Sequence, residues 1–591
     1  MWALKRLVAV VLHLCCCPLI TNGEETEFLN QNWTSEARQQ FYTTSQGSRI
    51  MPYDWFLALE ASDSQDSFAQ KKLLELGYIE NSNTDHNPDR LPVGFVLDEN
   101  KITQEKFVGL NCAACHTNQI HFEGRVFQID GAPALSDMWE LLQGIDNSLQ
   151  ATLRNDDKFQ RFSTKVLSVA TTNGSNPADL KRDLRKFSSD WKQFVQDSTV
   201  AHPWGRGRLD AFGMIFNRVS SINIGIPENS SKPDAPVSIP FLWGTSFQDR
   251  VQWNGSAENS NDIERLGRNV GEVLGVFAQA QFRATPMLEI PIPARTSAKR
   301  LNQVRLENQL KQLWSPEWPT AFGDFDNTQL RAGKVLYDRH CVSCHTVVPH
   351  GLQNTPVEVS MTALSEVQTD PRAAVNAASG TVSTGSLRSF FDGKAEVPRG
   401  VMLKKFVQLS LISPYRDIGK GNLLERLSTD DLFQPNEISA FLREIGVGQK
   451  LAMAFVDADK EKISSYYEKL QQSMASMTST QRSAMVAADA PSTLEYKAAP
   501  LAGIWATAPY LHNGSVPNLY ELLLPAAQRS KRFLVGSRQF DPKKVGFRTE
   551  FEEVSTLLDT ALPGNSNSGH DMYGVFSESE RWDLIEYLKS L

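Results

Sequence analysis

Apolar residues recur at three- and four-residue intervals in several stretches of the chain, which is the spacing of one helix face. The clearest stretches are 134–153 and 179–194, and we expect each to form an amphipathic helix with a solvated charged face. Residues 268–274 and 328–345 are also predicted to be helical. The last of these has a capped start and runs into a cysteine-containing segment.

Other parts of the chain lack this periodicity. Residues 24–105 mix short aromatic clusters with polar loops, and residues 346–440 are predicted to be loops that contain glycine and serine. Residues 460–490 are rich in Ser, Met and Gln and predict a polar helical hairpin, to which we assign no function. The predicted fold is therefore mainly α, with long irregular loops and insertions and little β.

Residues 1–23 have the pattern of a secretory signal peptide. Lys5 and Arg6 precede an apolar stretch at 7–20, and small residues follow it. This stretch is too short for a membrane span, and no later segment offers about 18 consecutive apolar residues. A lipoprotein signal that retains Cys17 is the alternative, although another cysteine precedes Cys17. We expect export, to the periplasm or the medium, without a transmembrane span.

Two C-x-x-C-H runs carry the most specific chemistry, at 112–116 and 341–345. In such a run both thiols can add to the vinyl groups of a haem, and the histidine that follows can bind the iron. The pattern therefore predicts two covalently bound haem c groups. The residues involved are Cys112, Cys115, His116, Cys341, Cys344 and His345.

The cysteine count supports this interpretation. The chain has seven cysteines, of which three lie at 15–17 within the signal, so the two runs hold all the others. A zinc site would need further thiolates or a matching histidine pair, and none lies close in the sequence. The remaining alternative is a pair of redox dithiols.

Length and charge limit the wider picture. A chain of 591 residues with 41% hydrophobic content can bury substantial cores, and its length suggests two to four domains. The two haem runs favour two domains, at 24–320 and 321–591. The boundary falls at 314–319, where two Trp and two Pro lie between helical patterns. The net charge of −8 gives no reason to expect a nucleic-acid partner.

Further residues between the runs are candidates for roles around the haems. Arg206 and Arg208 lie among glycines and suit binding of haem propionates, or they are surface arginines before a helix. Trp253 lies beside Asn-Gly at a predicted turn, where it could relay electrons or simply pack. Glu272 is a candidate acid–base group, although most helical glutamates are solvated. Met402 is a conceivable thioether ligand.

The segment 505–523 contains T-x-P-Y-x-H-N-G-S at 507–515. Together with the two C-x-x-C-H runs and the Trp-Asn-Gly at 253–255, it resembles the di-haem cytochrome c peroxidase superfamily. The resemblance extends over most of the mature chain and implies two cytochrome c-like domains. It also implies that His512 and the arginines hold propionates or intervening water, and that Trp253 lies on the electron route.

Details favour one branch of this superfamily. Residues 535–542 and 562–570 are similar to the di-haem rubber oxygenases, and Ala526 stands where the peroxidases usually have a methionine ligand. The resemblance implies that His570 completes a bis-histidine haem with His345. The alternatives are a histidine in a surface loop, or Met572 as the ligand.

The first haem is expected to differ from the second. The peroxidases have a histidine a short way after the first run, whereas 128–138 contains none. His116 is then the only protein ligand, and the distal side stays open. Thr507 and Pro509 match positions whose carbonyls bind calcium between the haems in the peroxidases, but we identify no third ligand, so calcium is left open.

Three functions follow from this arrangement. The first is activation of dioxygen at the N-terminal haem and cleavage of an apolar olefin such as polyisoprene. The second is a periplasmic peroxidase that reduces hydrogen peroxide with electrons from a small redox protein and uses Glu272 as its acid–base group. The third is a non-catalytic electron carrier or a modifier of another protein by long-range oxidation.

Overall fold

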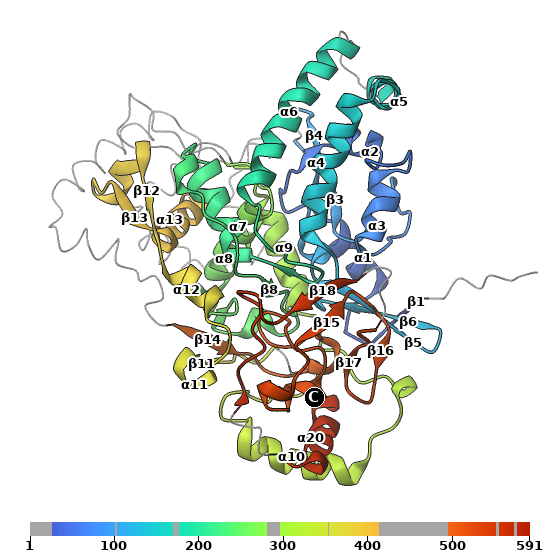
Figure 1. Cartoon of the computed structure of the whole chain (residues 1–591), viewed down its shortest axis with the longest axis vertical. Coiled ribbons are helices and arrows are strands. Elements are labelled where there is room, and N and C mark those ends of the chain that lie inside the picture. The colour runs from blue at the N-terminus through green and yellow to red at the C-terminus, as the bar shows by residue number, and fades with distance from the viewer. Residues whose placement is uncertain are drawn as a thin grey trace, which may run out of the picture.

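The computed structural model describes residues 26–100, 103–169, 176–280, 296–352, 354–412, 494–550, 555–571 and 576–591 (Figure 1). The predicted signal peptide, the predicted hairpin at 460–490 and Met572 lie outside these residues. No helix in the described ranges combines the length and the apolar composition that a membrane crossing requires.

The helices of the described residues extend from the N-terminal part to the last residues of the chain. They are α1 (Ser35–Thr43), α2 (Tyr53–Ala58), α3 (Leu73–Glu75), α4 (Met138–Arg154), α5 (Asp156–Val169), α6 (Pro177–Asp197), α7 (Ala211–Asn217), α8 (Asp262–Gly275), α9 (Arg300–Leu310), α10 (Asn327–His340), α11 (Leu364–Val367), α12 (Arg372–Ala378), α13 (Arg399–Ile412), α19 (Leu519–Leu522) and α20 (Glu578–Lys589).

The strands form small sheets. Two sheets have three strands, in the orders β1 (Thr26–Phe28), β6 (Arg125–Asp130), β5 (Thr117–Phe122) and β2 (Met51–Pro52), β4 (Lys106–Leu110), β3 (Phe95–Glu99). The antiparallel pairs are β7 (Arg208–Leu209) with β8 (Val237–Ser238), β9 (Arg250–Val251) with β10 (Ala257–Glu258), β11 (Ser360–Ala363) with β14 (Glu495–Ala498), β12 (Thr381–Ser383) with β13 (Glu396–Pro398), β15 (Arg532–Val535) with β18 (Thr556–Asp559), and β16 (Phe540–Asp541) with β17 (Gly546–Phe547). The fold is therefore mixed, and the prediction of little β is confirmed only in part.

The periodic stretches form helices close to where they were expected. The predicted helix at 134–153 is α4, which starts later because Asp137 caps it by accepting from the Glu140 amide. The helix predicted at 179–194 is α6, and 268–274 lies within α8. The helix predicted at 328–345 ends at His340, before the second haem run.

The prediction of loops over 346–440 is confirmed at 346–352 and 354–359, but it is wrong for much of the described remainder. This segment forms α11, α12 and α13, and Met402 on α13 is fully buried in a hydrophobic cluster with Val270 and Phe406. A thioether packed among aliphatic and aromatic side chains acts as core, so the suggested ligand role for Met402 is not supported. The sequence pattern missed α13 because apolar residues occur all round this helix.

The largest hydrophobic cluster joins the two halves of the chain. It contains Phe41 and Trp243 from before residue 320, and Trp505 and Leu584 from after it. Two hydrogen bonds also connect residues before and after residue 320. The Trp243 indole donates to the Ala502 carbonyl at 2.7 Å, and the Trp505 indole donates to the Pro316 carbonyl at 3.0 Å. This hydrophobic cluster does not divide at residue 320. The domain boundary near 320 stays a prediction.

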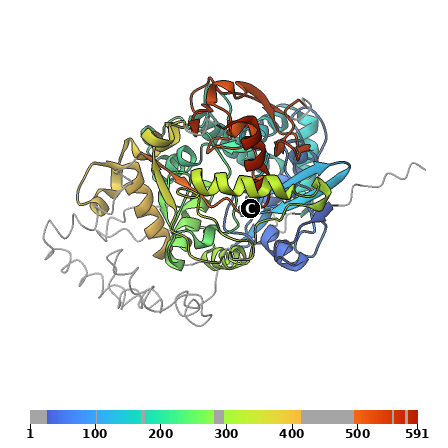
Figure 2. The ribbon, with the colours of Figure 1, turned by 90° about the horizontal axis from the view of Figure 1, so that it is seen from below.

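The last helix packs tightly on the helix that leads into the second haem run. α20 lies against α10 at the lower end of the molecule (Figures 1 and 2). A Cβ atom at Gly333 of α10 would lie 1.9 Å from the Asp583 carbonyl oxygen, so only glycine permits this approach. The contact fixes the position of residues 341–345.

Candidate functional site

The first C-x-x-C-H run forms a single tight turn. Cys112–Ala114 is a 3-10 helix, and the Asn111 side chain caps it by accepting from the Ala113 amide at 3.0 Å. The same side chain donates to the Phe41 and Thr44 carbonyls, which ties the turn to α1. The turn places the two cysteines on one side, as attachment to the vinyl groups of one haem requires.

His116 is oriented by a carbonyl from another segment. Its Nδ1 lies 2.8 Å from the Pro240 carbonyl oxygen, so Nδ1 carries the proton and donates. The Nε2 atom is then left as the free ligand nitrogen. Burial lowers the pKa of His116 to about 4, and the imidazole is neutral, as metal binding requires.

The second run repeats this arrangement. The His345 amide donates to the Cys341 carbonyl at 2.8 Å, and His345 Nδ1 lies 2.8 Å from the Ala499 carbonyl oxygen. Burial lowers the pKa of His345 as well. Two sites with the same internal geometry and the same kind of outer partner fit two histidine-ligated haems.

One cavity, of about 1360 Å³, is lined by both runs. Pockets for a single small ligand usually enclose roughly 300–1,000 Å³, so this cavity exceeds the size that one ligand needs. The attachment and ligand residues that line it are Cys112, Cys115, His116, Cys341, Cys344 and His345. Their shared cavity places both expected haems in one space.

His570 faces His345 across this cavity. The two ring centroids are 6.4 Å apart, and the ring planes differ by 21°. Metal–imidazole bonds are about 2.0 Å long, so two imidazoles that ligate one metal ion from opposite sides have centroids roughly 6 Å apart. The pair therefore fits a bis-histidine haem. Over the described residues, the structure gives His116 no such imidazole partner.

The loop that carries His570 is held by the H-N-G-S segment. The Asn513 side chain donates to the Gly564 and Ser566 carbonyls at 3.1 and 2.9 Å, and the Ser515 hydroxyl donates to the Ser566 carbonyl at 2.9 Å. His570 itself has φ of 60°, an uncommon backbone conformation for a residue other than glycine. Such conformations persist at sites whose surroundings hold them in place.

Trp253 and His512 both line the cavity. The Trp253 indole donates to the Ser238 carbonyl at 2.8 Å, which fixes its ring. His512 stacks on Tyr496 with centroids 4.2 Å apart, and its Nδ1 lies 3.5 Å from the Thr369 hydroxyl. Burial, with His570 nearby, lowers the pKa of His512 to about 3.

Glu272 also lines the cavity, on α8. The Glu272 side chain is 42% exposed at the cavity wall. The residue nevertheless lies well inside the protein, where burial raises the pKa of its carboxyl group. The Gln252 side chain donates to Glu272 Oε1 at 3.2 Å, and Arg268 Nε lies 4.0 Å from the same oxygen. A carboxyl with a raised pKa beside a cavity is a candidate acid–base group.

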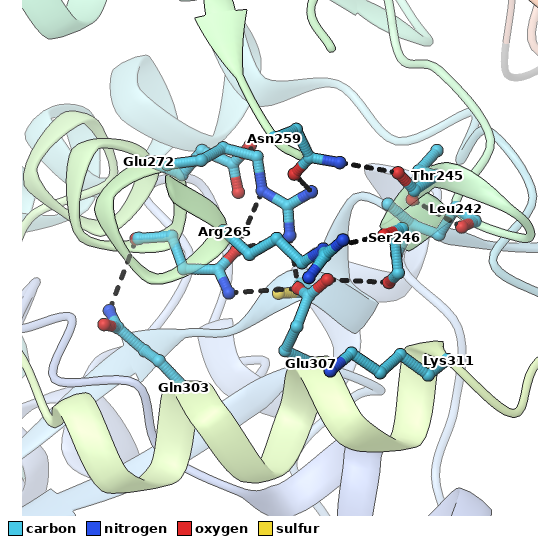
Figure 3. A network of polar contacts seen from close by, with 12 residues as sticks. Leu242, Thr245, Ser246, Asn259, Arg265, Glu272, Gln303, Glu307 and Lys311 are labelled. Carbon is cyan, nitrogen blue, oxygen red and sulfur yellow. Dashed lines mark hydrogen bonds and ion pairs between the residues drawn. The ribbon is translucent and has the colours of Figure 1, made fainter. Parts of the chain in front are cut away.

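Arg268 belongs to a buried polar network. It is paired with Glu307 of α9 and donates to the Asn259 side chain at 2.8 Å. Figure 3 shows Glu307 beside Ser246, whose hydroxyl donates to Glu307 Oε1 at 2.6 Å. The sequence interpretation singled out Glu272 but missed Arg268, although the spacing of four residues on one helix could have revealed the pair.

The structure does not bring Arg206 and Arg208 to the cavity, since neither is among its lining residues. Arg206 donates to the Glu75 carbonyl at 2.6 Å, and Arg208 donates to the Trp204 carbonyl and the Asn565 side chain, both at 2.8 Å. Their guanidinium groups therefore hold chain segments together. This geometry offers no support for their proposed contact with propionates.

The wall formed by α7, α8 and α13 is largely apolar. It includes Phe212, Ile215, Phe216, Val407 and Leu411. The sequence interpretation missed it, because α13 had been expected to be a loop. For calcium, Thr507 and Pro509 line the cavity, and the described ranges contain no group of three or more His, Cys, Asp or Glu arranged for a metal.

One comparison with known proteins bears on the cofactor. Residues 495–534 match the family described as RoxA-like, cytochrome c-like. A cytochrome c-like domain implies haem c. The matched segment includes Ala499, which orients His345, and His512 in the H-N-G-S segment.

Two relatives come from Sinorhizobium fredii. The chain is 29% identical over 618 aligned positions to the uncharacterized protein y4iJ, an alignment that covers 96% of this chain and 94% of that protein. It is 38% identical over 122 positions to the uncharacterized protein y4iM, covering 17% of this chain and 28% of that protein. Both names leave the activity open.

Proposed function

We propose that the chain is an exported di-haem c-type oxidoreductase that activates dioxygen at its N-terminal haem and cleaves an apolar olefin. The observation that carries this proposal is the asymmetry within one cavity. His345 has His570 at bis-histidine distance, whereas His116 faces the same cavity without such a partner among the described residues. A haem iron with a free axial position binds dioxygen or peroxide, and a saturated one transfers electrons.

The residues around the ligands support this division of labour. The carbonyls of Pro240 and Ala499 hold each imidazole in the tautomer that leaves Nε2 free. Trp253 is fixed in the wall of the cavity that both runs share, where an aromatic ring can connect the two sites electronically. The H-N-G-S segment holds the loop that presents His570.

The substrate class follows from the apolar wall. α7, α8 and α13 expose aliphatic and aromatic side chains to the cavity that contains His116. A Cβ atom at Gly271 of α8 would lie 3.4 Å from Val407 and 3.8 Å from Ile215, so glycine widens the space at this point. An apolar chain is stabilised here by removal of its surface from water. We therefore propose an olefin that is cleaved to two carbonyl products by one dioxygen molecule.

A second candidate is a peroxidase, and one observation favours it. Glu272 opens onto the cavity with a raised pKa and with Gln252 and Arg268 beside it. The carboxylate form of Glu272 could accept a proton from one oxygen of hydrogen peroxide and then donate it to the other. Such an enzyme would draw electrons from a small redox protein, whereas the oxygenase needs no donor.

One experiment separates these functions. The purified protein is examined by optical and EPR spectroscopy as isolated, and then with dioxygen and with peroxide, while consumption of each is followed. The oxygenase predicts one low-spin haem, one open haem that is stable toward peroxide, and carbonyl products from a polyisoprene sample by mass spectrometry. Rapid peroxide turnover with a reduced cytochrome would instead establish the peroxidase. Two inert low-spin haems would leave only electron transfer.

A further inference from the structure

Lys497 lies in the wall of the cavity that both haem runs line. It belongs to β14, and its backbone amide donates to the Trp253 carbonyl at 2.7 Å. Two residues later, the Ala499 carbonyl orients His345. The segment around β14 therefore contacts both Trp253 and His345, and Lys497 belongs to this strand.

The ammonium group of Lys497 has a neutral partner. Its Nζ donates to Gln248 Oε1 at 2.6 Å, and within the described ranges the structure places no carboxylate at ion-pair distance from it. Arg268, the neighbouring cation, is already paired with Glu307. Burial, with Arg268 nearby, lowers the pKa of Lys497 to about 7, while the charge of Asp249 acts in the opposite direction.

A cation inside a protein is costly to desolvate unless an anion accompanies it. Haem c brings such anions, because its propionates are carboxylates and both haems are expected in this cavity. The arginines that the sequence suggested for this purpose lie outside the cavity lining. Lys497 is thus a cation that lines the cavity and forms no ion pair with a carboxylate of the described residues, although Asp249 lies close enough to act on its charge.

We propose that Lys497 binds a haem propionate through Nζ, and that it thereby positions the haem and raises its reduction potential. The inference rests on the two haem sites and not on the reaction that they catalyse. Gln248 orients the ammonium group and leaves its other protons for the carboxylate. A positive charge at this point disfavours the ferric state, because oxidation adds a further positive charge.

The test compares Lys497→Met with Lys497→Arg in the haem-loaded full chain. We expect Lys497→Met to lower the equilibrium constant for reduction of the adjacent haem about tenfold, which is 59 mV for a one-electron couple. Lys497→Arg keeps the charge and should stay close to wild type. Lys186→Met makes the same change at a lysine that is 79% exposed on α6, and it should have no effect.

Covalent haem content is measured first, followed by spectroelectrochemistry of both haems and resonance Raman spectra of the propionate bending bands. A more negative potential and a shifted band at one haem or both would support the proposal and identify the haem. A fully loaded Lys497→Met protein with unchanged potentials and bands would overturn it. Should Lys497→Met fail to fold, Lys497→Gln, with a polar group of similar length, replaces it.

A wild-type protein without covalent haem would give a different result. It would refute the haem sites, and the lysine proposal with them. Unchanged haem potentials and propionate bands in haem-loaded Lys497→Met would refute the lysine proposal alone.

Discussion

The ring orientation of His116 and of His345 is set by one hydrogen bond to a backbone carbonyl of a distant segment. Pro240 and Ala499 lie 124 and 154 residues from the histidines that they orient, and both use a backbone carbonyl at 2.8 Å. A carbonyl carries no side-chain signal, so no sequence pattern identifies these partners. The neutral tautomer that they fix is nevertheless what allows Nε2 to act as a ligand.

We expect His570→Ala to convert the second haem from low spin to high spin, because His345 would be left as its only axial ligand. EPR and optical spectra of the as-isolated protein measure this change. His202→Ala, at an exposed position, is the control and should keep the wild-type spectrum. An unchanged low-spin signal in His570→Ala would show that another residue is the sixth ligand.

Glu272→Gln distinguishes the two candidate reactions. If Glu272 transfers a proton, the amide should lower peroxide turnover by about 10²–10⁴-fold, the usual contribution of a general acid or base. Dioxygen-dependent cleavage of an apolar substrate should be affected much less. Burial raises the pKa of Glu272, and the carboxylate is the form that accepts the proton from peroxide, so wild-type peroxide turnover should decline as pH falls below this raised pKa.

At the scale of elements, α8 combines the polar and the apolar chemistry of the cavity. Its helical spacing places Glu272 one turn after Arg268, and Gly271 one turn after Gly267, and all four residues line the cavity. Glycine within a helix costs about 0.5–1 kcal/mol relative to alanine. Space beside the helix is therefore maintained at the expense of helix stability.

Gly271→Leu should block the apolar part of the cavity. We expect turnover of an apolar olefin to fall at least tenfold, while reaction with the small molecule peroxide is retained. Gly271→Ala is the matched variant: its Cβ makes an ordinary contact with Val407, and it should stabilise the protein by about 0.5–1 kcal/mol in denaturant unfolding. Normal olefin turnover by Gly271→Leu would contradict this placement of the substrate.

The residue directly before His570 is Gly569, whose backbone conformation favours glycine. Gly569 has φ of 106°, and a Cβ atom there would lie 2.8 Å from Cβ of Thr369. Gly569→Ala should cost about 1–3 kcal/mol of unfolding free energy and weaken the low-spin signal of the second haem. Gly225→Ala is the control, since Gly225 also has a positive φ, of 72°, but no atom within 4 Å of its Cβ position. Equal losses in both variants would exclude the steric explanation.

At the scale of the whole molecule, one core and one cavity serve both halves of the chain. The Trp243–Ala502 and Trp505–Pro316 hydrogen bonds connect the segments before and after residue 320 inside the same hydrophobic cluster. The two haem runs, far apart in sequence, consequently lie in the wall of one cavity. The position of the two runs relative to one another therefore depends on this shared core.

Residues 24–320 and 321–591 produced as separate fragments should not fold independently, because each would expose half of the shared core to water. Near-UV circular dichroism should show no fixed aromatic packing in either fragment alone. Co-expression should restore a soluble complex. A cooperative unfolding transition in an isolated fragment would instead support two autonomous domains.

Covalent haem attachment could be predicted without any tertiary structure, since the two cysteines and the histidine of each run lie within five consecutive residues. The sequence also predicted α4, α6 and α8, whose apolar periodicity reflects burial of one face. The meeting of distant groups depended on the folded chain. The fold set the carbonyls that orient the histidines, the distance from His570 to His345, the absence of Arg206 and Arg208 from the cavity lining, and the presence of Lys497 in it. These contacts join residues that are far apart in the chain, and burial, which sets their energies and pKa values, exists only once the core has formed.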